Sequence, residues 1–174
     1  PSGLVGANIV FPTVSVGATA NLMMAACLAR GETTITNAAC EPEIVDLANC
    51  LSQMGANIGG AETGRIKIIG VDRLCGAEHK VLPDRIETGT YAIAAAITGG
   101  TLDLIGTTID LIQTVADTLR AVGIELTVCQ NGVRVQQSGN RLGPVNIETR
   151  PYPGFPTDMQ AQIMALMTVS TGIS

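Results

Sequence analysis

Aromatic side chains are nearly absent from this chain of 174 residues, which has two Tyr, two Phe and no Trp. Charged residues are sparse as well, at 14%, whereas hydrophobic residues make up 46% of the chain. A core must therefore be built from Ala, Ile, Leu, Val and Met, a composition that suits closely packed helices and thin sheets. So few charges also indicate that much of the chain packs against other protein surface.

Clusters of positive charge are missing too. No two Lys or Arg residues are adjacent, and the net charge is −5 with a pI of about 4.7. A nucleic-acid partner requires a basic face, so we expect none. The apolar runs at 22–28 and 91–97 are too short to cross a bilayer, so we expect no membrane partner either. Because the chain opens without Met and closes just after a helical pattern, we expect it to be a piece of a longer protein.

The five cysteines are odd in number and never form a Cys-x-x-Cys pair, which disfavours a disulfide framework and a zinc site. We therefore expect no metal, and a reducing, cytoplasmic location. The glycine-rich phosphate-binding patterns of P-loop and Rossmann proteins are missing, so nucleotide-binding folds of those types are not supported.

The chain does contain an internal repeat. Residues 7–74 and 79–138 follow one plan: strand, apolar helix, strand, amphipathic helix and two short strands. Gly31 and Gly100, which follow the first helix of each copy, are 69 positions apart (100 minus 31). A third copy begins with a strand at 145–149 and a helix at 157–169. In the second copy we expect the first strand at 79–82, and in the first copy a helix over 16–30.

The first helices are apolar nearly all round, whereas the second helices carry a single apolar stripe. One arrangement satisfies both patterns: the apolar helices bundle at the centre, sheets wrap around them, and the one-sided helices cover the outside. The fold class predicted is therefore α/β, an inside-out α/β prism of repeated βαβαββ units. Two and a fraction copies do not complete such a prism.

Polar residues recur at the entrance of each central helix: residues 15–19, 84–90 and 155–162. Each has a plain structural explanation as a helix N-cap, with Asp84 and Asp158 as capping acids and Ser15 as a capping hydroxyl. If the helices run parallel, however, their N-termini gather at one end and create a positive field that suits an anionic substrate. Glu41 and Glu43, at the start of a second helix, are most simply interpreted as solvated first-turn acids.

Four segments carry a resemblance to a known family: Val14–Thr19 (VSVGAT), Asn37–Asp46 (NAACEPEIVD), Leu82–Thr90 (LPDRIETGT) and Phe155–Gln162 (FPTDMQAQ). Together they resemble the enolpyruvyl transferases that act on UDP-N-acetylglucosamine. The resemblance covers essentially the whole chain. It implies two inside-out domains of three repeats each, with residues 1–82 ending one domain as its last repeat. Residues 83–174 would supply the first repeat, and the start of the next, of the other domain.

The resemblance also implies a reaction. Such enzymes transfer the enolpyruvyl group of phosphoenolpyruvate to the 3-hydroxyl of UDP-N-acetylglucosamine and release phosphate, without a metal or an organic cofactor. This is the first committed step of peptidoglycan synthesis, on which cell-wall biogenesis, cell shape and cell division depend. The partners implied are the two substrates and the remaining segments of the same enzyme.

By the same resemblance, Asp158 matches the acid that takes the proton from the sugar hydroxyl. The segment that contacts the UDP moiety is matched by Thr13, Val14, Ser15 and Val16. Cleft residues near the reacting groups are matched by Glu41 and Arg85, and Gly17 and Thr157 are also expected to bind substrate.

Two departures from the family pattern stand out. The family commonly has Lys where this chain has Thr13, and the loop with the reactive Cys lies outside this span. A second hypothesis is therefore a catalytically silent module that only folds or binds UDP-sugar, and a weaker third is a homologue that has lost its activity.

Overall fold

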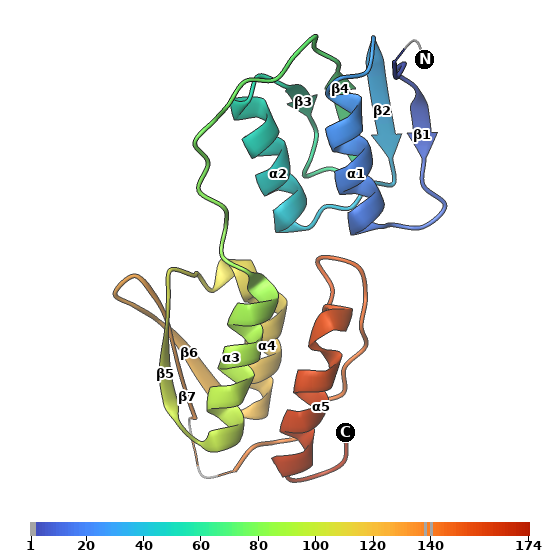
Figure 1. Cartoon of the computed structure of the whole chain (residues 1–174). Coiled ribbons are helices and arrows are strands. Elements are labelled where there is room, and N and C mark those ends of the chain that lie inside the picture. The colour runs from blue at the N-terminus through green and yellow to red at the C-terminus, as the bar shows by residue number, and fades with distance from the viewer. Residues whose placement is uncertain (1–2, 138, 140) are drawn as a thin grey trace. The chain divides into compact units, whose positions relative to one another are not determined.

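The computed structural model describes residues 3–137, 139 and 141–174. It divides into two compact units, Pro1–Leu82 and Pro83–Ser174 (Figure 1). None of the helices described is both long and apolar enough to cross a membrane.

Unit 1 is a four-stranded sheet with two helices side by side on one face (Figure 1). Its strand order is β1-β2-β4-β3, with β1 parallel to β2 and the other pairs antiparallel. The core lies between sheet and helices, and at its centre Met23, Ile35, Ile44, Ile66 and Ile68 are fully buried. The elements are β1 (Asn8–Val10), α1 (Val16–Ala26), β2 (Glu32–Thr36), α2 (Pro42–Gln53), β3 (Asn57–Gly59) and β4 (Arg65–Ile69).

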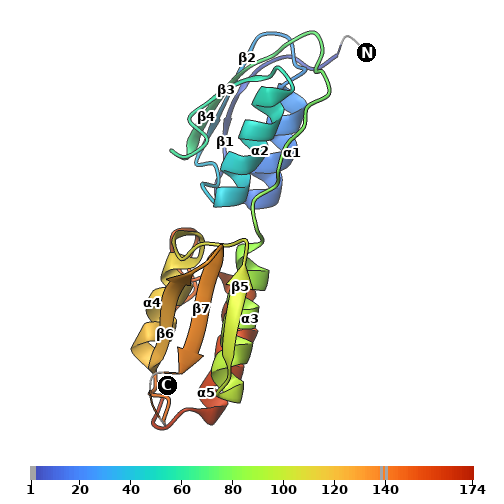
Figure 2. The ribbon, with the colours of Figure 1, turned by 90° about the vertical axis from the view of Figure 1, so that its left-hand side faces the viewer.

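Unit 2 repeats this plan with a three-stranded antiparallel sheet in the order β5-β7-β6 (Figure 2). Helices α3 and α4 pack on the sheet, and α5 packs against α3. The elements are α3 (Arg85–Thr98), β5 (Thr101–Ile105), the 3₁₀ turn η1 (Asp110–Ile112), α4 (Gln113–Val122), β6 (Ile124–Cys129), β7 (Gly132–Gln137), η2 (Thr157–Met159) and α5 (Gln160–Val169).

The repeat holds at the level of single residues. Helices α1 and α3 begin 69 positions apart (85 minus 16), and β2 and β5 keep the same offset at both of their ends. Residues with this spacing can therefore be compared directly between the units.

Three expected elements differ from the structure. No strand forms at 79–82, because the side chain of His79 contacts Asp46 and Gln53 of α2 and holds this segment on the helix. Residues 145–149 form only an isolated bridge, between Thr149 and Phe155, since none of the described strands lies beside them to pair with. Helix α1 ends at Ala26 instead of residue 30. The N–H groups of Leu28 and Ala29 donate to carbonyls three residues earlier, and not four as in an α-helix.

All five cysteines are free thiols with very different surroundings. Cys27 is fully buried, and its burial raises the pKa of the thiol, whereas Cys75 is exposed. Since the thiolate is the reactive form, we expect an aromatic disulfide reagent at pH 8 to modify Cys75 first and Cys27 only after denaturation. Mass spectrometry of the partly labelled chain checks this order. Early modification of Cys27 would contradict its placement in the core.

Candidate functional site

In unit 1 the candidate residues surround the N-terminus of α1. Ser15 is the N-cap: its backbone is extended and its Oγ accepts a hydrogen bond from the N–H of Ala18 at 3.3 Å. The hydroxyl of Thr19 donates to the carbonyl of Ser15 at 2.7 Å. The interpretation of Ser15 as a helix cap is thus confirmed, and this hydrogen bond stabilises the first turn of α1.

The cap leaves two backbone donors of the first turn available. The N–H groups of Val16 and Gly17 precede the first intrahelical bond, which runs from Thr19 to the carbonyl of Ser15. Thr13, Val14, Ser15 and Gly17 are exposed. A Cβ added to Gly17 would have no other atom within 4 Å, so the packing of the chain itself does not require glycine here. Such a helix start can accept an anionic group that approaches the backbone closely.

The start of α2 is tied to the start of α1. The N–H of Ala39 donates to Thr19 Oγ1 at 3.0 Å, and Asn37, with a positive φ of 59°, donates from its side chain to the carbonyl of Phe11. These bonds hold the 37–41 loop against the entrance of α1, so the two helix N-termini lie at the same end of unit 1 (Figure 1).

Glu41 occupies that loop and corrects the sequence-based interpretation. It was expected to be solvated, but its side chain is only 6% exposed, because the loop is packed between the two helix starts. It makes no side-chain capping bond, and its Oε2 has no hydrogen-bond partner among the described residues. A buried carboxylate oxygen without a donor is costly, so this atom needs a donor from outside the described part of the chain.

In unit 2 the N-terminus of α3 is capped by Asp84. Its Oδ1 accepts hydrogen bonds from the N–H groups of Ile86 at 2.7 Å and Glu87 at 3.1 Å. The next residue, Arg85, lines a cleft of about 270 Å³ together with the start of α4 and the 152–156 turn. That turn is held by Thr114, whose hydroxyl donates to the carbonyl of Pro153 at 2.7 Å.

Helices α3 and α5 lie side by side with their N-terminal ends adjacent. Gln162 donates from Nε2 to Thr90 Oγ1 at 3.0 Å, which joins the first turn of α5 to the second turn of α3. Met159 is fully buried at Gly89, where an added Cβ would lie 2.8 Å from its Cε. The parallel arrangement needed for a shared positive field is therefore present within unit 2.

Asp158 lies at this joint, in η2, with Thr157 beside it. Both side chains are exposed, and in the part of the chain that the structure describes the Asp158 carboxylate makes no hydrogen bond. Asp158 does not line the Arg85 cleft, although the nearby Tyr152, Pro153, Gly154 and Pro156 do. The carboxylate is thus open to a ligand. Asp158 does not cap the helix, contrary to the sequence-based interpretation, because the N-cap position is held by Pro156.

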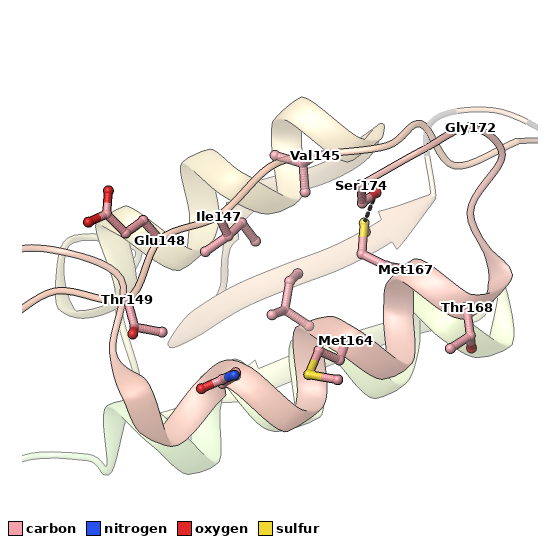
Figure 3. A pocket seen from close by; sticks show the side chains of 11 residues that line it. Val145, Ile147, Glu148, Thr149, Met164, Met167, Thr168, Gly172 and Ser174 are labelled. Carbon is pink, nitrogen blue, oxygen red and sulfur yellow. Dashed lines mark hydrogen bonds between the residues drawn. The ribbon is translucent and has the colours of Figure 1, made fainter.

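A larger hollow of unit 2 than the Arg85 cleft lies elsewhere. It is an open groove of about 660 Å³ between residues 145–149 and α5, with Val145, Ile147, Met164 and Met167 along it (Figure 3). None of the predicted site residues lines this groove. Nor does any group of three or more His, Cys, Asp or Glu within the described residues have the geometry of a metal site.

The predicted residues thus form two groups. Residues 13–17 and Glu41 meet in unit 1, and Arg85, Thr157 and Asp158 lie near the paired helix starts of unit 2. Gln162 was not among the predicted site residues. It lies partly buried at the α3–α5 contact, and its Oε1 is buried without a partner in the described chain. A polar side chain within an otherwise apolar helix was the signal that could have identified it.

The chain is similar to known carboxyvinyltransferases. The family model for EPSP synthase (3-phosphoshikimate 1-carboxyvinyltransferase) matches residues 2–174. A UDP-N-acetylglucosamine 1-carboxyvinyltransferase of Azorhizobium caulinodans is 59% identical over 174 residues, which is 100% of this chain and 41% of that protein. One from Rhizobium etli is 60% identical over 172 residues, 99% of this chain and 40% of that protein. The chain thus spans about two fifths of the length of these relatives.

Solved structures agree on the fold. The enolpyruvyl transferase NikO of Streptomyces tendae matches 99% of this chain and 44% of its own, with a TM-score of 0.85 at 21% identity. An EPSP synthase of Acinetobacter baumannii matches 84% of this chain and 34% of its own, with a TM-score of 0.61 at 22% identity. The inside-out α/β architecture expected from the repeat is confirmed. With its whole length matched, the chain belongs to the EPSP synthase family of carboxyvinyl (enolpyruvyl) transferases.

Proposed function

We propose that this chain is part of an enzyme that transfers the enolpyruvyl group of phosphoenolpyruvate to the 3-hydroxyl of UDP-N-acetylglucosamine. In this reaction the sugar oxygen bonds to C2 of phosphoenolpyruvate, its proton passes to a base, and C3 gains a proton. Loss of that proton and of the phosphate then restores the double bond. The observation that carries the proposal is the sequence identity of 55–60%, over 99–100% of this chain, to proteins named UDP-N-acetylglucosamine 1-carboxyvinyltransferase.

In this proposal the start of α1 binds the diphosphate of the UDP-sugar. The N–H groups of Val16 and Gly17 lie in the first turn of α1, which Ser15 caps, and have no hydrogen-bond partner among the described residues. Thr13 and Val14 extend the same contact. Thr13 is neutral where the family commonly has Lys, so the backbone donors here supply a larger share of the attraction to the anion.

Glu41 would accept a hydrogen bond from a hydroxyl or amide of the sugar. Its buried Oε2 has an unused acceptor position, which a ligand donor at the helix start would satisfy. Because the atom is already desolvated, a sugar that lacks this donor would leave it unpaired and would bind more weakly.

In unit 2, Asp158 would act as the base for the 3-hydroxyl, with Thr157 and Arg85 binding the reacting groups. The Asp158 carboxylate is exposed and has no partner within the described residues, as a base that must contact its substrate requires. The Arg85 cleft opens beside the turn that precedes η2 and suits an anionic group. Acid catalysis at C3 would come from residues outside this chain.

The same proposal assigns residues 1–82 to the end of one domain and residues 83–174 to the beginning of the other. It also assigns the enzyme to the cytoplasm and to peptidoglycan synthesis, and with it to cell-wall biogenesis, cell shape and division. No metal or cofactor takes part in it.

A second candidate function is a catalytically silent module that folds and binds UDP-sugar weakly. The length of the chain, two fifths of that of its relatives, favours this description for the 174 residues alone. A chimera separates the two: residues 1–174 replace the matched 41% of the Azorhizobium protein. We expect the chimera to release phosphate from phosphoenolpyruvate only when UDP-N-acetylglucosamine is present, and the isolated chain to release none. A folded but inactive chimera would contradict the proposed function.

Gly17 provides a test of the diphosphate contact. Replacing Gly17 with Ala should stabilise α1 by roughly 0.5–1 kcal/mol, since glycine disfavours the helix and the added Cβ meets open space. The same methyl group would obstruct the close approach of a phosphate. We therefore expect a higher melting temperature together with at least tenfold weaker binding of UDP-N-acetylglucosamine by the chimera, on the order of 1.4 kcal/mol, in calorimetric titration. Met24→Ala, at an exposed position two turns farther along α1, is the control. Unchanged affinity in Gly17→Ala would place the diphosphate elsewhere.

A further inference from the structure

Thr19, near the start of α1, is completely buried together with its hydroxyl group. That hydroxyl donates to the carbonyl of Ser15 at 2.7 Å and accepts a hydrogen bond from the N–H of Ala39 at 3.0 Å. A hydroxyl has one proton and two lone pairs, so both bonds can form at once. Thr19 therefore joins the N-cap of α1 to a loop 20 positions farther along the chain.

The N–H of Ala39 depends on this bond. Ala39 is fully buried, and its N–H has no other hydrogen-bond partner among the described residues. An N–H group left unsatisfied in the interior is costly, so loss of the Thr19 hydroxyl would favour a shift of the loop toward water. Glu41 lies two residues farther along, and its buried side chain would move with the loop.

The same joint recurs in unit 2. Thr88, 69 positions after Thr19, donates to the carbonyl of Asp84, the N-cap of α3, at 2.7 Å. Its Oγ1 lies 3.3 Å from that of Thr107, in the loop between β5 and η1. Both Thr88 and Thr107 are buried. In each unit a buried threonine thus links the start of the first helix to the loop that leads toward the second.

This arrangement differs from the usual behaviour of threonine in a helix, which is to bond only to its own helix. Thr118 is an example, since in the described chain its hydroxyl bonds only to the carbonyl of Thr114, four residues earlier on α4. When residues 15–20 are compared with residues 84–89, the threonine is the one residue type that both units have at the same place. The joint is therefore a feature of the repeat and does not follow from similar surroundings.

In unit 1 the joint connects two parts of the proposed UDP-sugar site. The N–H groups of Val16 and Gly17 lie in the turn that Ser15 caps, and Glu41 follows the loop that Thr19 holds. A nucleoside diphosphate sugar has an anionic diphosphate and a neutral sugar, so the amides and the carboxylate must keep a fixed separation to contact one ligand. A displaced loop would lose the contact with the sugar and leave the contact with the diphosphate.

We propose that Thr19 is a positioning residue that holds Glu41 against the start of α1, so that one UDP-sugar contacts both. The proposal rests on the proposed function, since it takes Glu41 as the acceptor for the sugar and the start of α1 as the diphosphate site. Without the hydroxyl the start of α1 stays in place, because the Ser15 cap and the bond from the N–H of Thr19 to the carbonyl of Ser15 remain. Thr19 thus governs recognition of the sugar and has little influence on the attraction to the diphosphate.

Calorimetric titration of the chimera with UDP and with UDP-N-acetylglucosamine provides the first arm of the test. Thr19→Val keeps the shape of the buried side chain and removes its hydroxyl. We expect it to weaken binding of UDP-N-acetylglucosamine at least about tenfold and to change the affinity for UDP less than about threefold. Thr19→Ser, which keeps Oγ, should bind both ligands as the parent does. Equal loss of both affinities in Thr19→Val, or no loss of either, overturns the proposal.

The matched control is Thr118→Val, which removes a hydroxyl that bonds only within its own helix in the described chain. It should leave both affinities unchanged. Glu41→Ala distinguishes positioning from direct contact with the ligand. If Thr19 acts through Glu41, adding Thr19→Val to Glu41→Ala should weaken binding of UDP-N-acetylglucosamine no further. A second, additive loss would show that Thr19 acts by another route and would overturn its positioning role.

Hydrogen exchange at the amide of Ala39 provides an arm that needs no ligand. In the chimera we expect Thr19→Val to speed this exchange at least about tenfold and Thr19→Ser to leave it slow. Slow exchange in both variants would show that Thr19 does not hold the loop.

Failure of this proposal and failure of the proposed function give different results. A chimera that binds neither UDP nor UDP-N-acetylglucosamine contradicts the proposed function, and the positioning role of Thr19 falls with it. A chimera that binds both, and in which Thr19→Val leaves the ratio of the two affinities unchanged, contradicts only the positioning role.

Discussion

Replacing Asp158 with Asn in the chimera is expected to lower turnover by about two to four orders of magnitude. Asn keeps the shape of Asp but cannot accept the proton of the 3-hydroxyl. The side chain is exposed and makes no hydrogen bond within the described residues, so the fold should be unaffected. Phosphate release at saturating substrate measures the effect on turnover, and calorimetric titration measures the affinity for UDP-N-acetylglucosamine, which should change less than about threefold.

The control is Asp117→Asn on the exposed face of α4, where the carboxylate bonds only to its helix neighbours Gln113 and Arg120. It should leave turnover unchanged. If Asp158→Asn retains full turnover, Asp158 is not the base. If it loses affinity by the same factor as turnover, Asp158 is a binding residue instead.

Replacing Gly70 with Ala should have the largest effect on stability. Gly70 follows β4 and donates to the carbonyl of Gly31 at 2.9 Å, which brings the chain against the end of α1. An added Cβ would overlap the backbone carbonyl of Ala29, and a backbone atom cannot rotate away as a side chain can. We expect the free energy of unfolding of unit 1 to fall by about 3 kcal/mol.

For a unit of this size such a loss should lower the melting temperature by more than about 10 °C, which scanning calorimetry measures. The matched control is Gly76→Ala, in the segment that follows, where the added Cβ has no atom within 4 Å. Equal melting temperatures for the two variants would show that β4 and α1 do not approach each other as closely as described.

Local patterns proved reliable where nearest neighbours decide the structure. The Ser15 and Asp84 caps depend on a side chain reaching an amide two or three residues away, so their sequence positions were sufficient to predict them. The same is true of Pro42 at the first turn of α2, and of the glycines that end helices.

Patterns that depend on a distant partner were less reliable. A strand was expected at 79–82 from residue types alone, but a strand needs a neighbour, and His79 is bound to α2 instead. Glu41 has the sequence context of a solvated first-turn acid, yet the loop that carries it is packed between two helix starts. Gln162 belongs to a segment singled out in the sequence but was given no site role, because its partner, Thr90, lies 72 positions away on another helix.

The amino-acid sequence by itself determined the repeat, its period of 69 residues, the alternation of apolar and one-sided helices, and the family motifs. The repeat and the two kinds of helix follow from composition and spacing, whereas the motifs identify the family by resemblance. Only the tertiary structure decided which helix starts lie together within each unit, that a carboxylate oxygen of Glu41 is buried without a donor among the described residues, and that no described strand lies along the outer side of β5. The physical reason is that burial and strand pairing are properties of two surfaces in contact, and each of these cases depends on a surface contributed by residues far away in the chain.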